Sequence, residues 1–190
     1  NDQGDIILAD LDGDNDLDII ATSINGDKVG WWENDDNGEF SSMKQIDGSF
    51  GESHALYAAD LDNDGDMDLI GASRETGQVA IWDNVGNGFF SKSIIDFDFD
   101  DASDLMAADL DGDGKLDILA SSDNHTSGQA NIAWWQQQED ENGNTKWVKN
   151  VVETDFEGAH EVYAEDVNGD NKVDIVAANE DELAMWDIGK

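Results

Sequence analysis

The sequence predicts an all-β protein, a β-propeller of four four-stranded blades whose last blade is incomplete. One acidic nine-residue segment occurs four times, at residues 10–18, 60–68, 109–117 and 166–174, so successive copies start 50, 49 and 57 residues apart. We call these segments acidic loops 1 to 4 and number their positions one to nine. Each lies between short apolar runs bounded by Gly, Asn, Asp and Ser, a pattern typical of strands joined by turns. Repeated units of about 50 residues built from strands favour propeller blades over a β-sandwich, which does not require identical units.

Every unit repeats the same order of expected strands. The first strand precedes the acidic loop, at 6–9, 56–59, 105–108 and 162–164. The second overlaps the end of the loop, at 17–21, 67–71, 116–120 and 173–177. The third ends in Trp, at 29–32, 79–82, 132–135 and 183–186. A fourth is expected only in the first three units, around 40–46, 90–95 and 147–152. Helical periodicity is absent over any helix-length segment.

We expect one domain with blades at about residues 1–50, 51–100, 101–155 and 156–190. The fourth blade lacks a strand, and neither terminus offers a spare one. Four blades can close a small ring. Alternatively, the chain is part of a larger ring that flanking sequence or a second copy of the chain completes. The sequence leaves these arrangements open.

Composition excludes several classes of function. The net charge is −37, with 46 acidic and nine basic residues, which argues against binding to nucleic acid or to anionic membranes. An apolar content of 38% with seven Trp indicates a folded chain rather than an acidic tail. The chain has no Cys, so disulfides, zinc–thiolate sites and Cys nucleophiles are excluded. No apolar stretch reaches membrane-spanning length.

The acidic loops predict calcium sites, about four Ca²⁺ with one in each blade. Positions one, three and five are Asp or Asn in every loop and position nine is always Asp, which suits a cation that takes six to eight oxygen ligands. Position seven is Asp or Lys, so we expect it to contribute its backbone carbonyl. An EF-hand is excluded because position twelve is Ala or Gly and strands flank the loops. The predicted metal positions are Asp10, Asp12, Asp14, Asp16, Asp18, Asp60, Asp62, Asp64, Asp66, Asp68, Asp109, Asp111, Asp113, Lys115, Asp117, Asp166, Asn168, Asp170, Lys172 and Asp174.

Two segments carry a family resemblance, Ala-Asp-Leu-Asp-Gly-Asp-Gly-Lys-Leu-Asp-Ile at 108–118 and Val-Gly-Trp-Trp-Glu-Asn at 29–34. Together with Gly-Ala-His at 158–160, they resemble FG-GAP/VCBS-type repeats over almost the whole chain. The resemblance implies an integrin-alpha-like propeller with calcium in a hairpin loop of each blade. The sequence departs from the pattern at Asn168, which replaces an Asp, and in having few blades.

The resemblance implies a non-enzymatic, calcium-stabilised module of a secreted or cell-surface protein that mediates adhesion or binds a glycan or protein ligand. One alternative is an accessory or catalytic part of a secreted polysaccharide-degrading enzyme, and another is an architectural spacer. The histidines form no recognisable catalytic spacing. The Trp that ends each third strand is expected to pack between blades. The longest connections, Ser121–Asn131 and Gln136–Thr145, are the best candidates for a ligand site.

Overall fold

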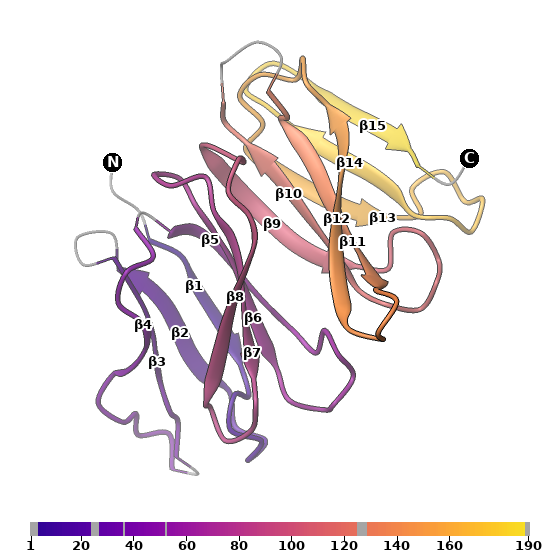
Figure 1. Cartoon of the computed structure of the whole chain (residues 1–190). Helices are drawn as coiled ribbons and strands as arrows, with labels where there is room; N and C mark the ends of the chain where they lie inside the picture. Colours follow the sequence, from indigo (N-terminus) through magenta and orange to yellow (C-terminus); the bar gives the residue numbers. More distant parts are fainter. Residues whose placement is uncertain (1–3, 24–26, 36, 52, 125–128, 189–190) are drawn as a thin grey trace. The chain divides into compact units, whose positions relative to one another are not determined.

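The structure is a computed structural model that describes residues 4–23, 27–35, 37–51, 53–124 and 129–188. Its regular elements are strands, arranged in four antiparallel sheets of three or four strands each (Figure 1). The predicted all-β class is therefore confirmed, including the missing strand of the fourth sheet. Over these residues, no helix is long and apolar enough to cross a membrane.

Each sheet is a meander in which neighbours in sequence are neighbours in space. The first sheet contains β1 (Ile6–Ala9), β2 (Asp18–Ser23), β3 (Lys28–Trp32) and β4 (Lys44–Asp47). The second contains β5 (Ser53–Ala59), β6 (Asp68–Ser73), β7 (Val79–Asn84) and β8 (Phe90–Asp96). The third contains β9 (Ala102–Ala108), β10 (Asp117–Ser122), β11 (Ile132–Glu139) and β12 (Thr145–Glu153). The fourth contains β13 (Glu161–Glu165), β14 (Asp174–Ala178) and β15 (Leu183–Asp187).

The chain forms two compact units of two sheets each, Asn1–Asp100 and Asp101–Lys190. Directly paired residues of an antiparallel sheet lie on the same face. We call face A the side that carries the positions of Ile6, Ile19 and Trp32, and face B the side that carries the positions of Ile7, Ile20 and Trp31. The same division applies to all four sheets because their registers correspond.

In the first unit, face A of the second sheet packs on face B of the first. Leu56, Leu69 and Trp82 of face A share one buried core with residues of face B. The face B residues of this core include Ile20 and Trp31, which are also fully buried. Burial of apolar side chains from both sheets at about 25 cal/mol per Å² is the main force that holds them together.

The second unit repeats this packing. Val162, Ile175 and Trp186 of face A of the fourth sheet pack in one core with Leu119 and Trp134 from face B of the third. Consecutive sheets within a unit are therefore stacked in the same sense, face A of the later sheet on face B of the earlier one.

An aromatic pair that the sequence analysis missed recurs in both cores. Phe50 meets Trp82 edge to face with centroids 4.8 Å apart, and Phe156 meets Trp186 in the same way at 5.4 Å. A constant offset could have revealed these phenylalanines, since Phe50, Phe99 and Phe156 each precede an acidic loop by ten residues. The pairs agree with the expected packing role of the recurrent Trp.

A polar contact joins the two sheets of each unit at equivalent positions. The Asp5 Oδ2 atom accepts a hydrogen bond from the Leu56 backbone N–H at 2.9 Å. The Asp104 Oδ2 atom accepts one from the Val162 N–H at 3.0 Å. Each bond links a residue in or directly before the first strand of one sheet to the first strand of the next.

Candidate metal centres

Each acidic loop forms the hairpin turn between the first and second strands of its sheet. Position nine pairs with the last residue of the first strand, as Asp18 does with Ala9 and Asp117 with Ala108. The loop thus occupies the end of the hairpin, and position nine is already part of the second strand.

The backbone of the loops is bent in the same way in all four copies. Positions four and six have positive φ in every loop, for example 78° at Gly112 and 88° at Gly114. These positions hold only Gly or Asn, the residues that adopt the left-handed region most readily. This conformation winds the chain around the carboxylate at position one. In loop 1 the Asp10 carboxylate accepts hydrogen bonds from the N–H groups of Gly13, Asp14 and Asn15 at 2.8, 3.1 and 2.9 Å.

Position nine has a structural role that the sequence analysis did not predict. The Asp18 Oδ2 atom accepts the Leu11 N–H at 2.9 Å, and its Oδ1 atom accepts the Asn34 N–H at 2.9 Å. Asp68 and Asp117 make the same two bonds in loops 2 and 3. In these three loops the buried carboxylate links the start of the loop to the backbone two residues after the recurrent Trp, at Asn34, Asn84 and Gln137.

Three of the four loops gather carboxylate oxygens into one compact group. One oxygen from each of positions one, three and nine lies within 4.8 Å of the others. The groups are Asp10, Asp12 and Asp18; Asp60, Asp62 and Asp68; and Asp109, Asp111 and Asp117. Position five is not part of these groups, and in every loop its Oδ1 atom accepts the N–H of position seven at 2.8 to 3.0 Å. Position seven takes part here through its backbone.

Burial and mutual repulsion disfavour the ionised forms of these groups. Burial, followed by the charges of Asp14 and Asp18, raises the pKa of Asp12 to about 6. Burial is also the largest cause that raises the pKa values of Asp68 and Asp117 to about 6, against the hydrogen bonds that lower them. A divalent cation removes this penalty, since it places positive charge beside the clustered oxygens.

The residues fit a hard cation. Every side-chain atom that the three groups offer as a metal ligand is a carboxylate oxygen, the ligand type that Ca²⁺ prefers. In loop 1 the Oδ1 atom of Asp12 is buried and has no hydrogen-bond partner in the part of the chain that is described. A buried acceptor of this kind is costly unless a donor or an ion satisfies it. A bound calcium would supply that partner and hold positions one, three and nine together.

Loop 4 is built differently at position three. Asn168 replaces the Asp, and its side-chain Nδ2 donates to the Oδ1 atom of Asp174 at 3.2 Å. The Oδ2 atom of Asp174 accepts the backbone N–H groups of Val167 and Asn168 at 3.1 and 3.2 Å. An amide N–H₂ therefore lies against the position-nine carboxylate, where the other three loops have a second carboxylate.

The residue after the recurrent Trp is a neighbour of position three that the sequence analysis missed. In loop 1, Glu33 is among the groups that raise the pKa of Asp12, and it is held by Lys44, whose Nζ lies 2.5 Å from Glu33 Oε2. In loop 3 the Gln136 side-chain amide donates to Asp111. In loop 2 burial raises the pKa of Asp83, and the charges of Asp62 and Asp64 add to this. The signal was the constant position of these residues one place after Trp.

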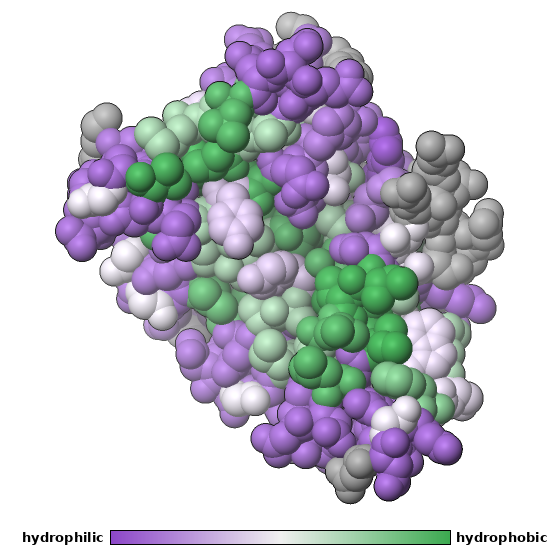
Figure 2. Space-filling view, turned by 180° about the vertical axis from the view of Figure 1, so that it is seen from behind, coloured by the Kyte–Doolittle hydropathy of each residue, from purple (hydrophilic) through white to green (hydrophobic). Residues whose placement is uncertain are grey.

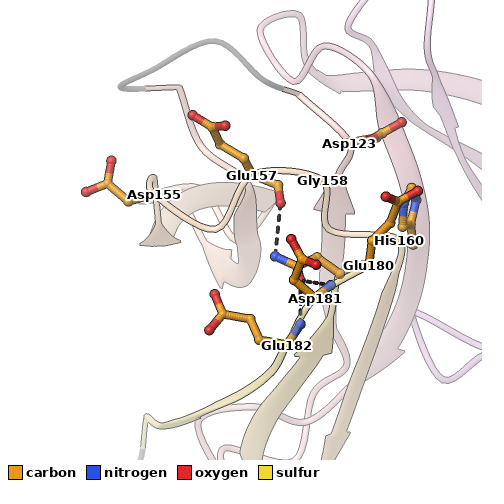
Figure 3. Close-up of a pocket in the computed structure, with 9 residues that line it drawn as sticks. Asp123, Asp155, Glu157, Gly158, His160, Glu180, Asp181 and Glu182 are labelled. Atoms are coloured by element: carbon orange, nitrogen blue, oxygen red, sulfur yellow. Dashed lines mark hydrogen bonds between the residues drawn. The ribbon is translucent and has the colours of Figure 1, made fainter.

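The two connections expected to form a ligand site, Ser121–Asn131 and Gln136–Thr145, differ in the structure. Most of Gln136–Thr145 is a hairpin that extends β11 and β12 rather than an irregular loop, because its first residues pair with 146–148. Residues 125–128 of the other connection lie outside the described part of the chain. Asp123 from that connection lines an acidic hollow of about 480 Å³ in the second unit (Figure 3). The hollow is lined by Asp123, Asp155, Glu157, Gly158, His160, Asn179, Glu180, Asp181 and Glu182.

Comparison with protein families identifies the repeat. The model of the FG-GAP-like repeat matches three overlapping segments, residues 10–71, 60–120 and 109–177, each of which spans two successive acidic loops. The chain belongs to the FG-GAP-like repeat family. The resemblance inferred from segments 29–34 and 108–118 is thus confirmed. A search of curated proteins found no match.

Among solved structures, the chain is similar to the biofilm matrix protein Bap1 of V. cholerae. The alignment has 18% sequence identity and a TM-score of 0.45, and it covers 96% of this chain. The chain spans 37% of the length of the Bap1 chain, and no inference about this FG-GAP-like repeat protein rests on the likeness.

Proposed function

We propose that this FG-GAP-like repeat chain is a non-enzymatic, calcium-stabilised β-propeller module of a secreted or cell-surface protein, with adhesion or ligand binding as its role. The observation that carries the proposal is a cluster of three carboxylates, at positions one, three and nine, that recurs in three successive loops. Chance acidity does not explain three copies with the same backbone and the same hydrogen bonds.

The calcium is structural in this proposal. Each ion binds at the closed end of a hairpin and neutralises carboxylates that repel one another by about 1–4 kcal/mol per pair at 4 Å. Loops 1 to 3 use Asp oxygens at positions one, three and nine, while positions five and seven shape the loop or add a carbonyl. Loop 4 binds more weakly because Asn168 replaces a carboxylate. We expect an affinity in the sub-millimolar to millimolar range, which suits an extracellular module.

The propeller arrangement is supported by how the sheets stack. In both units the later sheet places face A on face B of the earlier sheet, and one rule of stacking applied repeatedly generates the radial order of propeller blades. The partners we propose are an extracellular glycan or protein. Nucleic acid is disfavoured by the charge of −37.

Calcium titration of chelator-treated protein tests the proposal. Isothermal titration calorimetry is expected to detect three stronger sites and one weaker site, and the melting temperature is expected to rise with calcium. A site held at a hundred times its Kd contributes about 2.7 kcal/mol. The matched control is Asp35→Asn, which removes a carboxylate from a different hairpin turn that the Asp35 side chain caps. Absence of binding heat together with an unchanged melting curve would contradict the proposal.

Binding to glycan and peptide arrays, with calcium and with chelator, tests the adhesion role separately. A signal that depends on calcium supports a ligand-binding module. Failure to bind any probe in the presence of calcium would instead favour the architectural spacer.

A further inference from the structure

The residue directly after the recurrent Trp lies opposite position nine in the sheet. In the fourth sheet Asp187 pairs with Asp174. In the second sheet Leu69 pairs with Trp82, and the same register sets Asp83 opposite Asp68. Like charges directly opposite one another destabilise a sheet unless a cation offsets them. Yet three of the four residues at this place are acidic, the four being Glu33, Asp83, Gln136 and Asp187.

The hydrogen bonds of position nine hold this residue beside the loop. The Asp68 Oδ1 atom accepts the N–H of Asn84, the residue after Asp83, at 2.8 Å. The same bond forms in loops 1 and 3. In loop 3 the side chain at this place reaches the carboxylate group, since the Gln136 amide donates to Asp111. A side chain here therefore has access to position three.

In loops 1 and 2 the side chain at this place is a carboxylate. Burial raises the pKa of Asp83, and the nearby charges of Asp62 and Asp64 raise it further. Glu33 is among the groups that raise the pKa of Asp12, whose buried Oδ1 atom has no hydrogen-bond partner within the described residues. A carboxylate beside others that already repel it is a cost without a cation and a ligand with one.

We infer that Asp83 and Glu33 are further calcium ligands from outside the acidic loops, and that the ion thereby joins the hairpin of the first two strands to the third. The inference rests on the proposed function and deepens it. Loops 1 and 2 then offer four carboxylates, and loop 3 offers three and the Gln136 amide. Calcium affinity depends on the number of charged ligands, so loops 1 and 2 are expected to bind more tightly. Hydrophilic side chains surround the lower end of the first unit, where loop 1 lies (Figure 2).

Loop 1 carries a competitor for its added ligand. Lys44 Nζ lies 2.5 Å from Glu33 Oε2 and 4.3 Å from the centroid of the Trp31 ring. Lys44 pairs with Trp31 in the sheet. In the second sheet Ile81 takes the place of Trp31 and pairs with Ser93, so no lysine stands there. Calcium at loop 1 therefore competes with an ammonium group, and loop 2 is the better place for the main test.

Calcium titration followed by the backbone amide NMR signal of one glycine in each loop tests the inference site by site. Each of these glycine N–H groups donates to the carboxylate at position one, and they are Gly13, Gly65, Gly112 and Gly169. In Asp83→Asn the midpoint of the Gly65 signal is expected to move about tenfold to higher calcium, because loop 2 loses a charged ligand. The other three midpoints are expected to stay within about twofold, since their ligands are unchanged.

Asp27→Asn is the matched control. It removes the same charge from the first unit, but from the turn between β2 and β3, at the end of the sheet opposite to the acidic loops. Asp27 has a φ of 48°, which Asn adopts as readily. All four midpoints are expected to stay within about twofold of the unmodified chain. Thermal melting in chelator supplies a second readout, in which Asp83→Asn is expected to melt no lower than the unmodified chain because it removes a charge from a repelling group.

Release of Glu33 is the converse test. Lys44→Gln is expected to move the Gly13 midpoint about threefold to lower calcium, because an exposed ammonium no longer competes for the carboxylate. In a Glu33→Gln background the same change at Lys44 is expected to give no gain, since the ligand that it releases is absent.

Three results would overturn the inference. One is a Gly65 midpoint that Asp83→Asn leaves unchanged. Another is a shift shared by all four glycines, which would report a lost charge rather than a lost ligand. A third is a clear fall in the melting temperature of Asp83→Asn in chelator, which would assign Asp83 a structural role.

If Asp83→Asn does not fold, Gln136→Glu takes its place. It adds the fourth carboxylate to loop 3, so the Gly112 midpoint is expected to move about tenfold to lower calcium, and an unchanged midpoint would overturn the inference. If no glycine signal of the unmodified chain responds to calcium, the proposed function fails as well. A response of all four loops with an unchanged Gly65 midpoint in Asp83→Asn overturns this inference alone.

Discussion

Acidic loops 3 and 4 belong to the same unit and share a backbone, yet they present different side chains to the candidate ion. Both have positive φ at positions four and six and both wrap around the carboxylate at position one. Loop 3 then brings Asp109, Asp111 and Asp117 together. Loop 4 places an Asn168 amide against Asp174 instead. The comparison teaches that the fold of the loop and its charge are specified by different residues, Gly and Asn for the former and Asp for the latter.

The largest expected effect is at position nine. Asp117→Ala leaves the buried N–H groups of Leu110 and Gln137 without their acceptor and should cost about 2–4 kcal/mol in chelator. Asp174→Ala should cost less, since within the described residues the hydrogen bonds of Asp174 come from Val167 and Asn168 of its own loop. Urea denaturation of both variants in chelator measures the difference. Equal losses would show that the tie to the third strand contributes nothing.

The next largest effect is expected when the side chains at position three of loops 3 and 4 are exchanged. Asn168→Asp should strengthen calcium binding at loop 4 about tenfold, or 1.4 kcal/mol, because it adds a charged ligand where an amide donor stood. Asp111→Asn should weaken loop 3 by a similar factor. Calorimetric titration of the two variants and of the double variant checks this. An Asn168→Asp protein whose weakest site is unchanged would mean that position three does not bind the ion.

A smaller loss of stability, equal in loops 3 and 4, is expected when the glycine at position four is replaced, because the two loops share one backbone conformation. Gly112 and Gly169 have φ of 78° and 82°, and a Cβ at either would meet no atom within 4 Å. Gly112→Ala and Gly169→Ala should therefore each cost about 1 kcal/mol from backbone strain alone. Thermal unfolding in chelator provides the measurement. If the two costs differ markedly, the loops do not share one conformation in solution.

The smallest effect concerns the neighbour of position three. Gln136→Ala removes the amide that donates to Asp111 and should change stability by only about 0.5 kcal/mol, since the bond is exposed. Gln136→Glu should instead increase the calcium affinity of loop 3, because it adds a carboxylate beside the group. A lower affinity for Gln136→Glu would show that the added side chain repels rather than coordinates.

Much of the fold could be predicted from the sequence because its signals are local. Short apolar runs bounded by turn residues indicated the strands, and the constant spacing of the acidic loops indicated the repeated units. The family was recognisable from two short segments, and the first three acidic groups contain residues that the spacing had singled out. The number of bound ions, the closed ring and the blade boundaries stay predictions.

Other features were not predictable because they depend on contacts between distant residues. The tie from Asp18 to Asn34, the Phe50–Trp82 pair and the Glu33 side chain beside Asp12 join segments that are not adjacent in sequence. The extended hairpin of β11 and β12 was expected as a loop, since its Gln-rich and acidic residues give no strand signal.

The sequence by itself determined the repeat, the all-β class, the place of each acidic loop between two strands and the acidity of the chain, because these follow from residue types at short separations. Only the tertiary structure decided which positions of each loop converge, since a nine-residue pattern does not tell a ligand from a backbone acceptor. It also decided which apolar faces are covered. Only the stacking of one sheet on the next shows which faces meet within each unit, face A of the later sheet and face B of the earlier one.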